Sequence, residues 1–107
     1  ALAGLVQLLQ TIHVIKERLN PKLRISGIVP CRVDLRTNHA KEVVKELQNN
    51  FKDKMFKTAI RENIRLAEAP SFLKPITDYD SLCNGAHDYR MLAKEVIKRE
   101  KSKQKNA

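Results

Sequence analysis

Two short apolar runs, each flanked by segments with helical periodicity, constrain the fold of this chain more than any other feature of its sequence. The first run covers residues 23–29 and ends at Pro30, and the second covers residues 55–60. Both contain β-branched or aromatic residues and have the length of short strands. Because strands that alternate with helices form parallel sheets, this order predicts an α/β fold.

Helical segments separate the two expected strands. Apolar residues recur at helical spacing over residues 2–19, and Pro21 ends that helix because proline disfavours helix in the residue before it. A second helix is expected over residues 39–50, with Thr37 or Asn38 as its N-cap. The chain therefore begins in the order helix, strand, helix, strand.

The second half of the chain is expected to be mainly helical. Asn63 can cap a single helical turn that Pro70 ends, and an extended loop follows around residues 75–80. A last amphipathic helix begins after Gly85. From Lys98 onward the chain is almost entirely polar and basic, so we expect it to fray in water.

The predicted sheet is incomplete. Parallel strands need neighbours on both edges and helices on both faces, and two strands cannot provide these. The sequence also begins with Ala1 rather than Met. We therefore expect residues 1–97 to be a fragment of a larger α/β domain and residues 98–107 to be a basic, flexible tail.

The charge of the chain indicates a polyanionic partner. Lys and Arg number 21 and Asp and Glu number 12, which gives a net charge of +9 with histidine neutral. Nucleic acid is the first expectation and an anionic membrane surface the second. No apolar run approaches the roughly 18 residues that a membrane span needs. The alternative is a basic surface that only increases solubility.

Motifs for catalysis and metal binding are missing from the sequence. It has neither GxxxxGK[ST] nor GxGxxG, so no glycine-rich loop can surround a triphosphate. Cys31 and Cys83 lie far apart and outside any zinc-ligand spacing. No histidine lies near a serine or cysteine in a recognisable nucleophile motif. We therefore assign no catalytic residue and no metal ligand.

Two pairs of arginines carry the strongest functional signal. Arg32 and Arg36 follow the first expected strand, and Arg61 and Arg65 follow the second. Loops after adjacent parallel strands emerge at one edge of the sheet, so these arginines can converge there. Their planar guanidinium groups suit phosphate, and no aromatic residues lie between them, which favours contact with a nucleic-acid backbone over base stacking. The equally weighted alternative is that they form surface ion pairs with acids, namely Asp34, Glu62 and Glu68.

Several blocks of the sequence resemble the ParA/Soj family of chromosome and plasmid partition ATPases. IRENIRLAEAPS at residues 60–71 resembles the family's I-x-x-N-x-x-L-x-E-A-P-S, and DLRTN at residues 34–38 resembles its D-x-R-T-N. KPITDY at residues 74–79 and GAHDYRMLAKEVI at residues 85–97 resemble further blocks in the same order. The chain is identified by this resemblance as the C-terminal part of such a protein.

The resemblance implies a P-loop ATPase fold, with a mainly parallel sheet flanked by helices. Such proteins use ATP and Mg²⁺, form homodimers, bind DNA without sequence preference and act with a ParB/Spo0J-like partner. It also implies a cytoplasmic, nucleoid-associated protein without a membrane partner. The family's DNA-binding arginines correspond to Arg36 and Arg65. Its adenine contacts correspond to four positions, namely Pro30, Cys31, Arg61 and Asn63.

Two departures from the family limit this transfer. Arg61 stands where many members have proline, which weakens the adenine contact there. The Walker A and Walker B segments are absent, so we expect no ATPase activity from this chain alone. Two other interpretations stay open: a stand-alone DNA-binding or regulatory protein, and a module that mainly dimerises.

Overall fold

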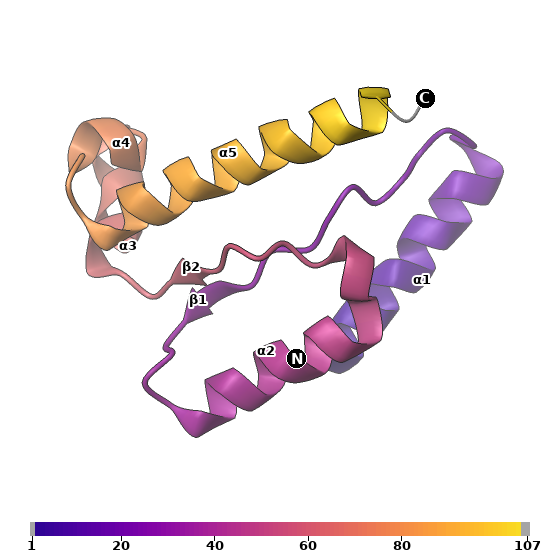
Figure 1. Ribbon diagram of the computed structural model, residues 1–107, viewed down its shortest axis with the longest axis horizontal. Helices are drawn as coiled ribbons and strands as arrows, with labels where there is room; N and C mark the ends of the chain where they lie inside the picture. Colours follow the sequence, from indigo (N-terminus) through magenta and orange to yellow (C-terminus); the bar gives the residue numbers. More distant parts are fainter. Residues whose placement is uncertain (1, 106–107) are drawn as a thin grey trace.

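The computed structural model describes residues 2–105 and has two short strands between helices (Figure 1). The long helix α5 runs along one side of the strands, α2 and α1 lie on the other, and α3 and α4 form one end. The elements in chain order are α1 (Leu2–Arg18), β1 (Cys31–Val33), α2 (Asn38–Phe51), the 3₁₀ turn η1 (Lys52–Lys54), β2 (Ile60–Arg61), α3 (Ile64–Glu68), the 3₁₀ turn η2 (Ala69–Phe72), α4 (Ile76–Tyr79) and α5 (Asn84–Lys105).

The two strands pair in parallel, which confirms the predicted α/β class. Cys31 lies opposite Ile60 and Val33 lies opposite Arg61, so one step along β2 spans two steps along β1. This shift is a β-bulge, and Arg32 is its extra residue. The Ile60 N–H donates to the Pro30 carbonyl at 2.8 Å, just before the bulge.

The strands lie further along the chain than we predicted. Of the expected segments, residues 23–29 contribute only an isolated parallel bridge between Ile28 and Met55. Pro30 does not end the pairing, because its carbonyl still accepts a ladder bond. The N–H groups of Lys57 and Thr58 donate instead to the Glu95 carboxylate at 2.8 and 2.9 Å, which interrupts the ladder between the bridge and β2.

The predicted helix caps are confirmed. The Thr37 hydroxyl accepts a hydrogen bond from the Ala40 N–H at 3.2 Å at the start of α2. The Asn63 side-chain oxygen accepts one from the Arg65 N–H at 3.0 Å at the start of α3. Each side chain satisfies a backbone donor that has no partner within the helix.

The α-helix before Pro70 ends as predicted, at Glu68 with Ala69 as its C-cap, but the chain continues through Pro70 as the 3₁₀ turn η2, where the missing proline N–H is not needed. One other local prediction was wrong. The segment predicted as an extended loop contains α4, in which the Tyr79 N–H donates to the Pro75 carbonyl at 2.9 Å. Proline at the start of α4 is compatible with a helical turn for the same reason.

The last helix continues past Lys98, where we expected the chain to fray. It reaches Lys105, at the end of the described residues. Glu100 Oε1 lies 3.7 Å from Lys103 Nζ, one turn later, and Glu100 Oε2 lies 3.7 Å from Arg24 Nη2. Long unbranched side chains and such spaced charge pairs favour helix. Within residues 2–105 no helix is long and apolar enough to cross a membrane.

The buried residues lie almost entirely after α2. Ala69, Ile76 and Ala86 form one cluster, against which Leu66, Tyr79 and Cys83 pack. Around the strands, Val33, Met55, Phe56 and Ile60 are also buried. The Cα radius of gyration is 15.9 Å, whereas a compact domain of this length has about 13 Å. The molecule is therefore more open than a typical domain.

Candidate functional site

An open hollow of about 1170 Å³ lies where β1 and β2 end. The loop after β1, the junction between β2 and α3, and the start of α5 form its walls. Parallel pairing places the two loops next to each other, and the Glu62 N–H donates to the Val33 carbonyl at 3.0 Å. The residues on its surface that the sequence singled out are Cys31, Arg32, Arg36, Arg61 and Asn63.

Arg36 forms a tight local pair with Asp34. Its Nε and Nη2 donate to the two carboxylate oxygens at 2.9 Å each, and its backbone N–H donates to Oδ1 at 3.1 Å. These bonds lower the pKa of Asp34 to about 2 and raise the pKa of Arg36. The Arg36 side chain is nevertheless 90% exposed, so a ligand in solution can reach it.

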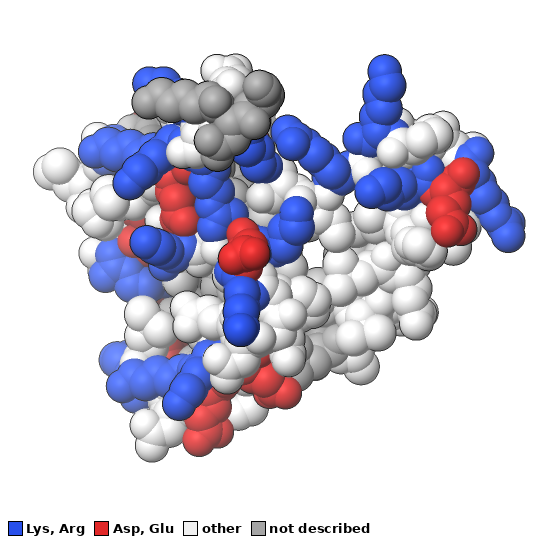
Figure 2. Space-filling model, turned by 45° about the vertical axis from the view of Figure 1, so that its right-hand side comes forward, with Lys and Arg blue, Asp and Glu red and all other residues white. Residues whose placement is uncertain are grey.

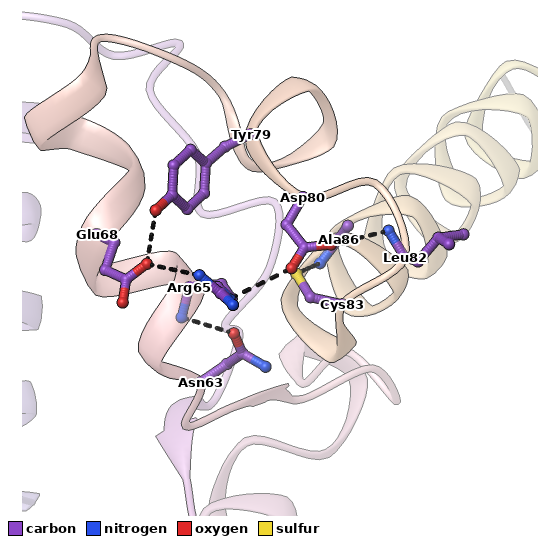
Figure 3. Close-up of polar contacts among 8 residues, drawn as sticks. All are labelled: Asn63, Arg65, Glu68, Tyr79, Asp80, Leu82, Cys83 and Ala86. Atoms are coloured by element: carbon purple, nitrogen blue, oxygen red, sulfur yellow. Dashed lines mark hydrogen bonds and ion pairs between the residues drawn. The ribbon is translucent and has the colours of Figure 1, made fainter.

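Arg65 projects from α3 toward α4 and the turn that follows it (Figure 3). Its Nη1 donates to Glu68 Oε2 at 3.1 Å, and its Nε lies 3.4 Å from Asp80 Oδ2. The Tyr79 hydroxyl donates to the same Glu68 oxygen at 2.6 Å. The Arg65 side chain is still 51% exposed. Glu68 of α3 and Asp80 of the turn after α4 therefore hold this guanidinium in place, and Tyr79 of α4 braces Glu68.

The same network raises the pKa of Arg65, chiefly through its hydrogen bond to Glu68, and shifts the pKa values of Glu68 and Tyr79. The hydrogen bond from Tyr79, with a further one from Arg65, lowers the pKa of Glu68 against the effect of burial. That bond also raises the pKa of Tyr79, because deprotonation would remove the donor. The Tyr79 ring stacks on Phe72 with centroids 5.1 Å apart, which fixes the direction of its hydroxyl. Glu68 therefore stays ionised and available to Arg65.

Arg61 is held most deeply of the four arginines. Its Nε and Nη2 donate to the two Asp88 oxygens at 3.0 and 2.9 Å, and its backbone N–H donates to Oδ2 at 3.0 Å. Asp88 is only 5% exposed. Burial raises the pKa of Asp88, but the bonds from Arg61 outweigh it and leave the pKa lowered. Arg61 thus joins β2 to α5.

The predicted adenine contacts are not all alike in their surroundings. Cys31 is exposed on the hollow, and Asn63 lies on it half-buried. The Asn63 oxygen is occupied by the Arg65 N–H, which leaves its amide nitrogen as a donor. Pro30 is buried and does not line the hollow, and the Arg61 guanidinium is already bound by Asp88. A base contact through Cys31 and Asn63 fits this arrangement better than one through Pro30 or Arg61.

The structure brings three of the four arginines to one hollow. Arg32, Arg36 and Arg61 line it, whereas Arg65 lies on the neighbouring helix and does not. Two of the acids considered as partners, Asp34 and Glu68, do form ion pairs. The sequence suggested either surface ion pairs or contact with phosphate. Arg36 and Arg65 form ion pairs and remain accessible to a ligand.

Sequence reasoning missed the long-range acids. Asp80 and Asp88 contact Arg65 and Arg61, and Asp88 lies 27 residues from its partner. No spacing rule connects residues so far apart, so only the packing of α5 against β2 could identify them. The bulge at Arg32 was also missed, because the backbone there depends on pairing with β2.

Basic side chains predominate on the face shown in Figure 2. Red acidic side chains are interspersed among the blue ones, so the excess positive charge is spread over this face rather than gathered in one patch. In the part of the chain that the structure describes, no three His, Cys, Asp or Glu residues could hold a metal ion together.

Comparison with known proteins gives consistent matches. Residues 4–76 match the CobQ/CobB/MinD/ParA nucleotide binding domain family. The chain is 43% identical over 107 residues to the chromosome partitioning protein ParA of Caulobacter vibrioides, covering 100% of this chain and 40% of the relative. It is 46% identical over 100 residues to the chromosome-partitioning ATPase Soj of Treponema pallidum, covering 94% and 40%. It is 47% identical over 96 residues to the sporulation initiation inhibitor protein Soj of Bacillus subtilis, covering 90% and 38%.

Proposed function

Because the chain belongs to the CobQ/CobB/MinD/ParA nucleotide-binding family, and within it resembles ParA and Soj, we propose that it supplies the DNA-backbone contacts of a chromosome-partitioning ATPase. The family assignment made from the sequence is confirmed. The chain spans about 40% of the length of these relatives, so the activity of a whole partition ATPase is part of the proposal.

The observation that carries the proposal is the meeting of two separate loops at one end of the strands. Arg36 comes from the loop after β1, and the β2–α3 junction beside it leads into Arg65. Both guanidinium groups are accessible and neither is buried against its acid. Arginine donates paired hydrogen bonds to phosphate oxygens, and such contacts do not distinguish one base sequence from another.

The acidic partners lower the strength of this site without closing it. A phosphate that binds Arg36 must replace the Asp34 oxygens, and one that binds Arg65 must compete with Glu68 and Asp80. Exposed ion pairs are worth only up to about 1 kcal/mol, so a polyanion with many phosphates can displace them. The proposal therefore expects weak, salt-sensitive binding.

The proposal extends to the nucleotide only through the adenine side. Cys31 and the Asn63 amide face the hollow and can contact a base, whereas no glycine-rich loop for the phosphates is present in the sequence. In a partition ATPase, ATP with Mg²⁺ supplies the energy for switching. We propose that the remaining 60% or so of such a protein, its second copy and a ParB/Spo0J-like partner complete the cycle at the nucleoid.

The test is fluorescence anisotropy with two unrelated DNA duplexes over a series of salt concentrations. Arg36→Gln and Arg65→Gln should each weaken binding to both duplexes about two- to threefold and lower the log–log salt slope by about one. Arg18→Gln, an exposed arginine at the end of α1, removes the same charge away from the hollow. The proposal fails if the two site variants match Arg18→Gln, or if only one duplex is affected.

A dimerisation module is the second candidate function, and the surface of α1 favours it. Val6 and Leu8 are more than half exposed, and among the side chains that the structure describes, no buried hydrophobic one comes from α1 or α2. Apolar helix surfaces of this kind occur at protein interfaces. Light scattering that finds a dimer, with DNA binding unchanged in the two arginine variants, would favour this function over the first.

A further inference from the structure

Arg32 is the one residue of β1 whose backbone departs from a strand. Its neighbours Cys31 and Val33 both pair with β2, and the register shift falls between them. Arg32 has a φ of 56°, in the left-handed region that favours glycine and asparagine. Holding a residue with a side chain there strains the backbone, so the bulge keeps an arginine where glycine would fit more easily.

The bulge changes what the arginine can reach. Side chains along a regular strand alternate between its two faces, and an extra residue breaks this alternation. Cys31 and Arg32 are adjacent in β1, yet both are exposed and both line the hollow, while Val33 after them is buried. Strained backbone of this kind is concentrated at binding sites, which makes Arg32 a candidate for ligand contact.

Arg32 also differs from the other three arginines in its charge environment. Arg36 is paired with Asp34, Arg61 with Asp88, and Arg65 with Glu68 and Asp80. Among residues 2–105, Arg32 has no such carboxylate partner, although Glu62 lines the same hollow. An incoming phosphate would therefore meet a full positive charge at Arg32 without displacing an acid.

We propose that Arg32 is a phosphate-binding residue of this surface and contributes more to DNA affinity than Arg36. This inference rests on the proposed DNA-backbone function and adds a residue to it. Arg32 would make the first contact with the backbone because its guanidinium is not neutralised. Arg36 would add a second contact after its pair with Asp34 opens.

The test compares Arg32→Gln with Arg36→Gln and Arg18→Gln in the anisotropy titration. Arg32→Gln should weaken binding to both duplexes about fivefold, more than Arg36→Gln does, and lower the salt slope by about one. Arg32→Lys keeps the charge and should retain most of the affinity, which a purely structural role would not predict. Asp34→Asn should strengthen binding by freeing Arg36.

Folding is checked on the same samples. Arg32→Gly and Arg32→Asn suit the left-handed backbone, so their melting temperatures by circular dichroism should equal or exceed that of the unchanged chain while their DNA affinity falls. Loss of affinity in these folded variants cannot come from unfolding. If Arg32→Gly melts higher and binds DNA as well as the unchanged chain, Arg32 has no role in binding.

The outcomes separate this inference from the proposed function. If Arg32→Gln matches Arg18→Gln while Arg36→Gln and Arg65→Gln weaken binding, the role of Arg32 is refuted and the DNA function stands. If all three match the control, the DNA function fails as well. A parallel titration with fluorescent ATP covers the other source of phosphate. Loss of ATP binding without loss of DNA binding in Arg32→Gln overturns the assignment to DNA.

Discussion

The segment that follows α2 and the two long helices before it are stabilised in different ways. From Met55 onward, apolar side chains are buried and acidic side chains bind backbone N–H groups of neighbouring segments. In α1 and α2 the apolar residues form stripes along each helix, but from Ala3 onward, where the structure describes the side chains, none of them is buried. The comparison teaches that helical periodicity creates an apolar face, while burial depends on what the rest of the fold places against it.

The functional hollow lies at the boundary between these two regions. Arg36 stands on the loop into α2, and its acid is two residues away. Arg65 stands in the packed region, where Asp80 reaches it from the turn after α4 and Tyr79 of α4 binds its partner Glu68. The position of the Arg36 side chain therefore depends on local sequence, whereas that of Arg65 depends on tertiary packing. Substitutions in the core should displace Arg65 more than Arg36.

The largest expected effect comes from deleting core volume on one side only. Ile76→Ala removes a side chain that packs in the cluster with Ala69 and Ala86, and we expect a loss of about 2–4 kcal/mol in unfolding free energy. Ile15→Ala is the matched change in α1, where the side chain is exposed, and should cost less than about 1 kcal/mol. Urea titration measures both, and equal losses would contradict the comparison.

The next largest effect is the loss of folding stability at low pH. The pKa values of Asp88 and Glu95 are lowered in the folded chain, because the bonds that they accept outweigh burial. The unfolded chain then binds more protons as pH falls, so stability is present above the ordinary pKa values of 3.8 and 4.5 and is lost below them. Asp88→Asn should cost about 2 kcal/mol at neutral pH.

Thermal melts from neutral pH down to about pH 3 check this expectation. The melting temperature of the unchanged chain should fall most steeply below about pH 4.5, and Asp88→Asn should flatten that fall. Asp53→Asn, at an exposed position in η1, serves as the control. A pH profile in Asp88→Asn as steep as that of the control would show that Asp88 does not carry the acid sensitivity.

A single kind of substitution should have opposite signs in the two regions. A Cβ added at Gly85 in α5 would lie 2.5 Å from the Leu66 Cγ, whereas one added at Gly4 in α1 would meet nothing within 4 Å. Gly85→Ala should therefore destabilise the chain by about 1–2 kcal/mol. Gly4→Ala should stabilise it by about 0.5–1 kcal/mol, because alanine favours helix. Chemical denaturation of both variants measures the contrast, and a shared sign would refute it.

The smallest effect sharpens the difference between the two arginines. Tyr79→Phe removes the hydroxyl that donates to Glu68, and we expect a loss of about 1 kcal/mol in stability. Glu68 then loses one of the bonds that hold it beside Arg65. We therefore expect a small change in the contribution of Arg65 to DNA affinity and no change in that of Arg36. Combining Tyr79→Phe with each arginine variant checks this: the effects should be additive with Arg36→Gln and non-additive with Arg65→Gln.

The sequence predicted the parallel class, the long helices and two caps because each depends on local signals. Thr37 and Asn63 precede helical segments and satisfy donors within three residues, which a spacing rule captures. Where the strands pair depends on which acceptor takes the N–H groups of Lys57 and Thr58, the neighbouring strand or the Glu95 carboxylate. The sequence alone does not predict that Glu95 takes them. The pairing of Arg61 with Asp88 likewise depends on how α5 packs.

The two cysteines differ in exposure, and this has a practical consequence. Cys31 is exposed on the hollow, whereas Cys83 is half-buried beside the start of α5 and accepts a bond from the Ala86 N–H at 3.4 Å. A maleimide dye should label position 31 first, since thiol chemistry follows access. The chain thus carries a native attachment point for a fluorophore, whose quenching would report occupancy of the hollow without any added tag.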